Sequence, residues 1–188
     1  MSLRTKRPAL LLIDFQKAFN DEAYWGGNRN NKDAEKNAEK ILLKWRELEL
    51  PIYHIRHSSQ EPTSKLHVSS PGFEFKKEVI PLPDETLITK NVNSAFIGTN
   101  LKQMLDDMCT DTLVIMGLTT NHCVSTTTRM AGNYGYKTIL INDATAAFDR
   151  VGVNGEKYDA ALIHLTTLAN LKDEFADIIS TKKLLEII

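Results

Sequence analysis

Short apolar runs recur along this chain and alternate with longer stretches in which the apolar residues follow a helical spacing. The short runs are rich in Leu, Ile and Val, which is typical of strands buried inside a parallel sheet. This pattern predicts strands at residues 9–14, 52–56, 86–89, 112–116, 138–141 and 176–179. Each strand ends close to a charged residue, a glycine or a loop-forming segment, so the runs are well separated.

Amphipathic stretches lie between these strands. Residues 32–48 carry apolar side chains three and four positions apart, with charged residues on the opposite face, as in a helix packed on a core. The same reasoning predicts helices at residues 32–48, 99–108, 125–131 and 156–171. Alternating strands and helices favour an α/β fold, with a parallel sheet covered by helices on both faces. Residues 57–85 are rich in Ser, Pro and Gly and predict no element, and a loop of that length is usually functional.

Length and composition narrow the classes of protein that need consideration. The chain has 188 residues, 25% charged residues and a formal net charge of −1, which predicts a single globular domain over residues 1–188. Lys and Arg alternate with Asp and Glu, so no basic surface for nucleic acid is expected. The longest apolar run, residues 9–13, is far too short to cross a membrane, and no signal-peptide pattern precedes it. Two cysteines, Cys109 and Cys123, form no disulfide framework, which favours the cytoplasm.

Three chemically useful side chains follow three of the predicted strands. Asp14 ends the first strand, Lys90 follows the third, and the loop 117–123, which contains Cys123, follows the fourth. In parallel α/β sheets, ligands bind at the carboxyl ends of the strands. We therefore expect these side chains to meet at one edge of the sheet. Considered singly, Asp14 has the alternative of capping a helix, and Lys90 that of a solvated loop lysine.

Cys123 lies at the junction between a predicted strand and the following helix. The positive end of a helix dipole and free backbone N–H groups lower a thiol pKa from about 8.5 and can hold an oxyanion. The alternative is a buried structural cysteine that packs as a small hydrophobe. In the catalytic interpretation, Asp14 accepts the thiol proton and Lys90 stabilises the anions. The backbone N–H groups of Thr119 and Cys123 would then form the oxyanion hole.

Five segments occur in an order that resembles the isochorismatase-like cysteine hydrolase superfamily, which includes nicotinamidases, N-carbamoylsarcosine amidohydrolases and isochorismatases. They are residues 9–16, 89–99, 117–124, 128–131 and 142–145. The resemblance implies a three-layer, Rossmann-like fold with a six-stranded parallel sheet. It also implies a catalytic triad of Asp14, Lys90 and Cys123, a cis peptide bond between Leu118 and Thr119, and a homodimer or homotetramer.

The same interpretation makes predictions about the substrate pocket and about metals. The residues predicted to line the pocket are Gln16, Phe19, Trp25, His57, Ser94 and Phe96. Nicotinamidases of this superfamily bind a metal through an Asp-x-His stretch, and the matching segment here, His54–His57, lacks it, so no metal is expected. No other cofactor is expected either, because neither a G-x-G-x-x-G nor a Walker A sequence occurs. His122 is a poor candidate for the base, because adjacent helical positions point about 100° apart.

These observations predict a metal-independent cysteine hydrolase that cleaves the C–N bond of a small amide, imide or ureido compound through a Cys123 thioester. One alternative is isochorismatase-type hydrolysis of a vinyl ether, which needs an acid rather than a nucleophile. Another is a non-catalytic binding protein that keeps the fold. The sequence leaves the identity of the substrate open.

Overall fold

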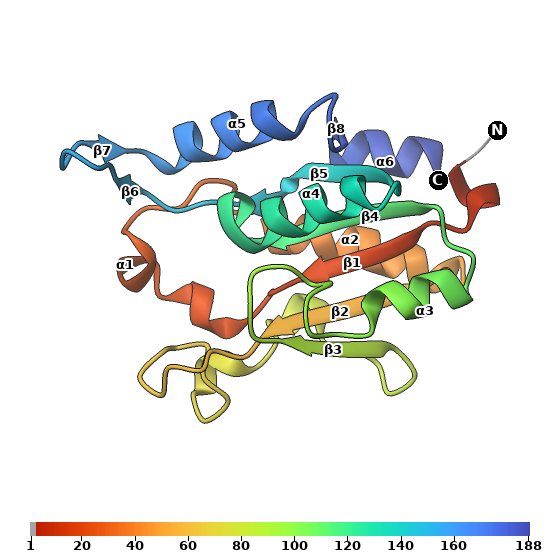
Figure 1. The fold of residues 1–188 in the computed structure, drawn as a ribbon, viewed down its shortest axis with the longest axis horizontal. Coiled ribbons are helices and arrows are strands. Elements are labelled where there is room, and N and C mark those ends of the chain that lie inside the picture. Colours follow the sequence, from red (N-terminus) through yellow and green to blue (C-terminus); the bar gives the residue numbers. More distant parts are fainter. Residues whose placement is uncertain (1–2) are drawn as a thin grey trace.

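The computed structural model describes residues 3–188, and its centre is a sheet of six parallel strands in the order β3–β2–β1–β4–β5–β8 (Figure 1). The strands are β1 (Ala9–Ile13), β2 (Ile52–His57), β3 (Thr86–Lys90), β4 (Thr112–Leu118), β5 (Lys137–Ala146) and β8 (Asp177–Ile179). All of the strand pairs in this sheet are parallel. The predicted fold class, a six-stranded parallel sheet with helices on both sides, is confirmed.

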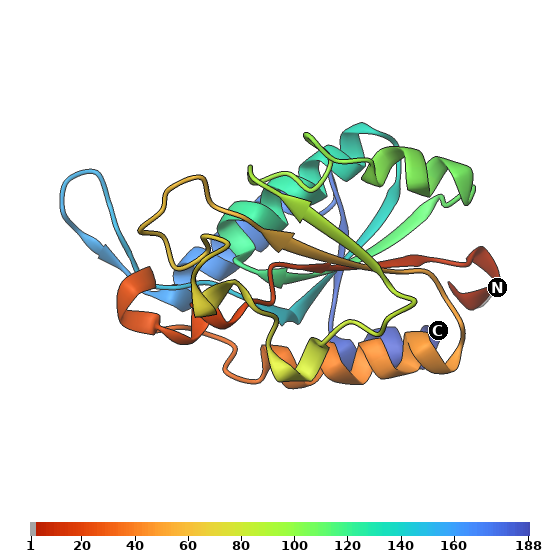
Figure 2. The same cartoon turned by 90° about the horizontal axis from the view of Figure 1, so that it is seen from below.

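Helices form a layer on each face of the sheet (Figure 2). The helices α2 (Ala34–Glu47) and α6 (Thr181–Ile187) pack on one face, and α3 (Leu101–Asp107), α4 (Ser125–Asn133) and α5 (Ala160–Leu171) pack on the other. Strand β1 shows how the sequence builds two cores, because successive side chains of a strand point to opposite faces. Leu10 and Leu12 enter the core beneath α2, whereas Leu11 and Ile13 enter the core beneath α3 and α4.

Several predicted boundaries move in the structure. The last long helix, α5, begins at Ala160, where the side chain of Asp159 accepts a hydrogen bond from the backbone N–H of Leu162. The preceding residues form a hairpin, β6 (Arg150–Val151) and β7 (Lys157–Tyr158), which projects from the body of the molecule (Figure 1). Helix α3 begins after Asn100, so Thr99 is not its N-cap residue. Helix α6 was not predicted.

The long segment after β2 contains only two short 3₁₀ turns, η3 (Pro71–Phe73) and η4 (Lys77–Val79). It lies beside η2 (Lys17–Asn20) and the one-turn helix α1 (Glu22–Trp25), which follow β1. These segments gather at the end of the sheet where the strands terminate (Figures 1 and 2). Among residues 3–188, no helix is both long enough and apolar enough to cross a membrane.

Candidate active site

Asp14, Lys90 and Cys123 meet at the carboxyl edge of the sheet. Asp14 directly follows β1, Lys90 is the last residue of β3, and Cys123 lies in η5 (Thr120–Val124), a π-helical turn between β4 and α4. The Nζ of Lys90 is 2.8 Å from Oδ2 of Asp14 and 3.2 Å from Sγ of Cys123. Because β1 pairs with β2 and β4, and β2 pairs with β3, these three segments end side by side at one edge.

Lys90 is the centre of this group, and its side chain is 0% exposed. Beyond Asp14 and Cys123, its Nζ lies 3.1 Å from Nδ1 of His57 and 3.2 Å from the carbonyl oxygen of Val92. Burial opposes the charge, but the Asp14 carboxylate and the Cys123 sulfur outweigh it and raise the pKa of Lys90. Burial and the Lys90 charge lower the pKa of His57. A neutral His57 therefore accepts a hydrogen bond from the Lys90 ammonium through Nδ1.

The electrostatics of Cys123 differ from the sequence-based prediction. The thiol is buried, and burial together with the neighbouring Asp14 carboxylate raises its pKa, whereas Lys90 acts in the opposite direction. The predicted lowering of the pKa is wrong, because the sequence revealed the helix dipole and Lys90 but not the depth of burial. In the resting protein the sulfur is consequently a thiol beside an Asp14–Lys90 ion pair, rather than a preformed thiolate.

Asp14 is placed to receive the thiol proton. Its Oδ2 contacts Lys90, whereas its Oδ1 is buried and has no hydrogen-bond partner among the described residues. A carboxylate oxygen of Asp14, a ring nitrogen of His57 and the sulfur of Cys123 lie within 4.8 Å of one another. Asp14 has a φ of 52°, in the left-handed region that Asp adopts more readily than most residues. This turn of the backbone directs the carboxylate back toward the strand ends.

The segment that runs from the end of β4 through η5 carries Thr119 and Cys123, the two residues whose backbone N–H groups were predicted to form an oxyanion hole. The peptide bond between Leu118 and Thr119 is cis, and both Thr119 and Cys123 line the cavity described below. Gly117 has a φ of 147°, and a Cβ atom there would lie 2.1 Å from the carbonyl oxygen of Ile13. Glycine at this position therefore lets the end of β4 approach β1 closely, which brings the Cys123 turn next to Asp14.

A cavity of about 260 Å³ opens beside Cys123. Phe19 and Trp25 form an aromatic wall with their ring centroids 4.6 Å apart. The lining residues are Phe19, Tyr24, Trp25, His57, Ser59, Ser64, Leu66, Asn93, Thr119, His122 and Cys123. None of these lining residues is Asp, Glu, Lys or Arg. A larger cavity, of about 600 Å³, is lined by residues such as Arg7, Pro51 and Met108 and lies far from the thiol.

Three residues predicted to line the pocket lie elsewhere. The side-chain amide of Gln16 donates to the carbonyl oxygens of His57 and Phe73 and accepts from the N–H of His57, so it joins three backbone segments. The hydroxyl of Ser94 contacts the sulfur of Met130 and caps the N–H of Phe96. Phe96 itself packs in the core beneath α3. The sequence indicated which segments carry these residues, but it did not show in which direction each side chain points.

Other lining residues were missed by the sequence reasoning. Ser59, Ser64 and Leu66 come from the long segment after β2, where no periodic pattern predicts which side chains turn inward. His122 lines the cavity, with its Nδ1 3.0 Å from Oγ1 of Thr119. Because His122 directly precedes Cys123 in the sequence, it could have been predicted to line the cavity rather than to act as the base.

Asp14, His57 and Cys123 are residue types that can hold a metal ion, so their surroundings bear on whether a metal fits here. The nitrogen of Lys90 lies 2.8–3.2 Å from atoms of Asp14, His57 and Cys123, so a cation already occupies the centre of this donor set. His54 does not join it, because its Nε2 lies 2.8 Å from Oε2 of Glu85. The residues present therefore do not fit a metal site while Lys90 keeps this position.

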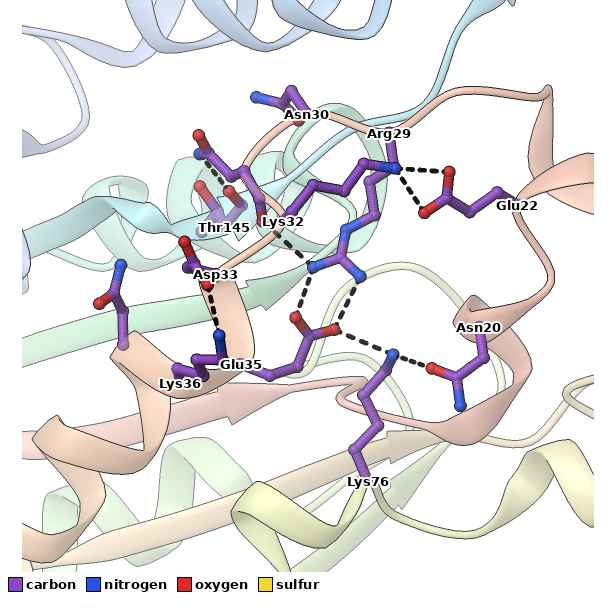
Figure 3. A network of polar contacts seen from close by, with 12 residues as sticks. Asn20, Glu22, Arg29, Asn30, Lys32, Asp33, Glu35, Lys36, Lys76 and Thr145 are labelled. Carbon is purple, nitrogen blue, oxygen red and sulfur yellow. Dashed lines mark hydrogen bonds and ion pairs between the residues drawn. The ribbon is translucent and has the colours of Figure 1, made fainter.

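A second buried charged cluster contains Arg29, Glu35 and Lys76. Figure 3 shows the Glu35 carboxylate between the Arg29 guanidinium and the Lys76 ammonium, with Asn20 beyond Lys76. The Arg29–Glu35 contacts are 2.8 and 2.5 Å, and Nζ of Lys76 is 2.9 Å from Oε1 of Glu35. Burial opposes ionisation of Glu35, but Arg29 and Lys76 outweigh it and lower its pKa. The cluster joins α2 to the segments that carry Phe19 and the turn η4.

The chain is similar to known proteins over almost its whole length. The isochorismatase domain model matches residues 8–183. The chain belongs to the isochorismatase family. Proteins of this family are hydrolases, as the sequence predicted. The isochorismatase family protein YrdC of Bacillus subtilis is 51% identical over 180 residues, which cover 96% of this chain and 95% of YrdC.

Two further relatives of the isochorismatase family extend the comparison. The crystal structure of a putative isochorismatase-family hydrolase from Chromobacterium violaceum superposes with a TM-score of 0.95 and 40% identity, covering 100% of this chain and 96% of that one. Nicotinamidase 3 of Arabidopsis thaliana is 27% identical over 194 residues, covering 96% of this chain and 88% of that protein. The family therefore includes a named amide hydrolase.

Proposed function

We propose that this isochorismatase-family hydrolase cleaves the C–N bond of a small amide, imide or ureido compound through a Cys123 thioester. The observation that carries the proposal is the contact of one buried ammonium, Lys90, with both Asp14 and Cys123 beside a cavity. A thiol, a carboxylate and a cation at one place supply a nucleophile, a base and a charge that stabilises anions.

The first step transfers the proton of Cys123 to Asp14 as the sulfur attacks the carbonyl carbon of the substrate. The raised pKa of Cys123 means that a free thiolate is not stored, so attack and proton transfer are coupled. Oδ1 of Asp14, which has no other partner among residues 3–188, receives the proton. Lys90 remains charged and balances the negative charge as it moves from carboxylate to sulfur and then to the substrate oxygen.

The attack produces a tetrahedral intermediate whose oxygen carries a negative charge. In this proposal, the N–H groups of Thr119 and Cys123 donate hydrogen bonds to that oxygen. Backbone donors held in place before reaction stabilise such an oxyanion without reorganisation, and removal of one donor typically costs about 10²–10³ in kcat. The position of both residues in the cavity lining supports this role.

The intermediate collapses when Asp14 returns the proton to the substrate nitrogen. The C–N bond breaks, ammonia or an amine leaves, and the acyl group remains on Sγ of Cys123 as a thioester. Asp14, ionised again, takes a proton from water, and the resulting hydroxide attacks the thioester. Sulfur departs and recovers a proton from Asp14, which restores the resting site and releases a carboxylic or carbamic acid.

The cavity also limits the substrate. Its volume of about 260 Å³ accommodates a small molecule, and its lining contains aromatic rings, hydroxyls and imidazoles. Because none of the described residues that line it is Asp, Glu, Lys or Arg, a substrate with a net charge would lose hydration without gaining an ion pair with the lining. We therefore expect neutral amides to be favoured over charged ones.

The vinyl-ether alternative needs an acid and no nucleophile. Cys123 has no task in that reaction, yet it lies within 3.2 Å of Lys90. The named nicotinamidase among the relatives also favours amide chemistry. A non-catalytic binding protein would not need a nucleophile, a base and a cation in contact, so the observed contacts favour an enzyme.

The test measures ammonia release from a panel of small carboxamides, carbamoyl compounds and ureas, and the loss of substrate for imides, which yield an acid and an amide rather than ammonia, all in the presence of EDTA. Wild-type protein and Cys123→Ala are compared, with isochorismate as a separate substrate. Turnover of a panel member by the wild type alone supports the proposal, as does a mass increase on Cys123 after rapid acid quench. Cleavage of isochorismate that survives Cys123→Ala, without any amide turnover, would establish the vinyl-ether reaction instead.

A further inference from the structure

The proposed mechanism gives no task to the buried imidazole of His164. His164 lies in the middle of α5 and is 5% exposed. Its Nδ1 is 2.9 Å from the hydroxyl oxygen of Thr120, which is 0% exposed. Thr120 is the first residue of η5, directly after Thr119. A helix from the far end of the chain is thus linked by a side chain to the turn that carries Cys123.

The surroundings of His164 determine which ring nitrogen carries the hydrogen. The ring hydrogen-bonds the backbone carbonyl of Asn142, and a carbonyl only accepts. The amide of Asn31, 3.4 Å from Nε2, already donates its hydrogens to the carbonyls of Asn142 and Thr145 at 2.8 and 2.7 Å. Nε2 therefore carries the hydrogen, and Nδ1 accepts the hydroxyl hydrogen of Thr120. Burial lowers the pKa of His164 to about 4, so this neutral form persists near pH 7.

Hydrogen bonds within residues 119–124 fix the internal shape of the turn that carries Cys123. They do not fix its position relative to the rest of the protein. The N–H groups of His122 and Val124 both donate to the carbonyl of Thr119, at 3.1 and 3.3 Å, and the hydroxyl of Thr119 contacts His122. These bonds make residues 119–124 move together. Helix α5 packs against η5, and the Thr120–His164 hydrogen bond fixes the turn relative to that helix and to the end of β5.

We propose that His164 is a positioning residue: through the hydroxyl of Thr120 it holds the turn so that the Thr119 N–H points at the oxyanion. The inference rests on the proposed function, because it requires an oxyanion to be stabilised. His164 is not among the residues that line the cavity beside Cys123. A misplaced N–H weakens only a bond made in the transition state, which lowers kcat and leaves KM unchanged.

The experiment compares variants that keep or remove one half of this hydrogen bond. The side chain of His164→Asn places an amide oxygen where Nδ1 lies, whereas that of His164→Gln reaches the position of Nε2 and offers Thr120 no acceptor. Thr120→Ser keeps the hydroxyl, and Thr120→Val removes it at nearly constant volume. We expect His164→Gln and Thr120→Val each to lower kcat on the order of tenfold to a hundredfold, below the loss of a whole oxyanion donor. His164→Asn and Thr120→Ser should recover most of kcat.

The double variant His164→Gln/Thr120→Val separates positioning from a general loss of stability. Its kcat should match that of either single variant, because both remove the same bond. The inference is overturned if kcat of both single variants stays within twofold of the wild type, or if KM rises while kcat holds. It is also overturned if the conservative variants lose as much kcat as the disruptive ones, or if the losses in the two disruptive variants multiply.

A second probe distinguishes failure of this inference from failure of the proposed function. p-Nitrophenyl acetate acylates a thiol through an oxyanion without requiring a particular amide. If the wild type releases p-nitrophenol but hydrolyses no amide, the proposed amide reaction fails and the acylation rates of the same variants decide the inference. If Cys123 is not acylated by this ester or by any amide, no oxyanion is formed there and both proposals fail.

Discussion

Two of the buried charged clusters among residues 3–188 differ in which of their polar atoms lack a hydrogen-bond partner. In the first, Asp14 and Lys90 form an ion pair of 2.8 Å beside the Cys123 thiol and a cavity. In the second, Glu35 lies between Arg29 and Lys76. Oδ1 of Asp14 has no hydrogen-bond partner among the described residues, whereas both oxygens of Glu35 are engaged.

This difference distinguishes a candidate site of proton transfer, the Asp14 cluster, from an ion cluster that joins parts of the structure, the Glu35 cluster. A carboxylate oxygen without a partner beside a thiol can accept a proton, whereas both oxygens of Glu35 are already bound by cationic side chains. The second cluster also contains an unpartnered atom, Nε of Arg29, but a guanidinium does not release its proton in proteins. Burial and ion pairing alone therefore do not identify catalytic groups. What identifies them is an unused acceptor next to a nucleophile and an accessible space.

The largest expected effect is a loss of kcat in variants of the Asp14 cluster that does not occur in a variant of the Glu35 cluster. Asp14→Asn, Lys90→Met and Cys123→Ala should each reduce kcat by about 10³-fold or more, because groups that act as a unit are not additive. Glu35→Gln should keep kcat within a few-fold of the wild type. The rate of ammonia release at saturating substrate measures kcat for all four variants. Comparable losses of kcat in the Glu35 variant and the Asp14 variant would remove the distinction drawn here.

The second effect separates the clusters by stability. Glu35→Gln leaves two buried cations without a counter-charge and should lower the free energy of unfolding by about 3–5 kcal/mol, measured by urea denaturation at pH 7. Glu39→Gln, an exposed position on the same helix, is the matched control and should change it by less than about 0.5 kcal/mol.

Acid should abolish this stability difference. Because the folded-state pKa of Glu35 lies below its ordinary value of 4.5, its contribution is complete above that value and is lost as the pH falls through the lower folded-state pKa. The gap between wild type and Glu35→Gln should therefore begin to narrow below about pH 4.5 and close only once the pH has fallen below the folded-state pKa. A gap that persists unchanged in acid would mean that the carboxylate charge is not its source.

The third effect concerns the thiol itself. Burial and the Asp14 carboxylate raise the pKa of Cys123, and Lys90 lowers it. Asp14→Asn removes a raising charge and leaves the lowering one, so the thiolate fraction at neutral pH should rise. Alkylation of Cys123 by iodoacetamide should become several-fold faster in this variant although turnover is lost, and several-fold slower in Lys90→Met. Mass spectrometry reports the rates, with the exposed Cys109 as internal reference.

The smallest effect concerns the cavity wall. Trp25→Leu removes the ring stacked on Phe19 and should raise KM a few-fold, which corresponds to about 1 kcal/mol, with little change in kcat. Tyr134→Leu, an exposed aromatic that lies outside the cavity lining, is the control. Equal changes in KM for the two variants would show that the wall residue has no specific contact with the substrate.

The fold and the meeting of the three reactive side chains were predictable because they depend on chain-wide patterns. Apolar runs locate the strands, and parallel strands bring their carboxyl ends together, so Asp14, Lys90 and Cys123 could be placed at one edge from spacing alone. The turn Asn154-Gly155 is a signature of the β6–β7 hairpin that the prediction of a helix from residue 156 overlooked.

The missed features depend on burial and on side-chain direction, which a single sequence does not encode locally. The pKa of Cys123 was predicted with the wrong sign because desolvation depends on segments remote in sequence. Gln16 and Phe96 follow strands, as the proposed catalytic residues do, but the side chain of Gln16 binds backbone groups and that of Phe96 packs in the core. Ser64 and Leu66 reach the cavity from a segment without periodicity, so no pattern marked them.

The Gln16 side chain has a consequence for how this protein can change. One amide holds the backbone of His57 and Phe73, so the residues between them form a closed loop whose two ends are fixed on the body of the molecule. The free energy of closing such a loop grows only slowly with length, by about 0.6 kcal/mol for each doubling. Segment 58–72 can therefore be lengthened or replaced at a small cost in the free energy of folding. Insertions or replacements there would reshape the wall formed by Ser59, Ser64 and Leu66 and alter substrate choice, while the reactive groups, carried by other segments, would keep their geometry.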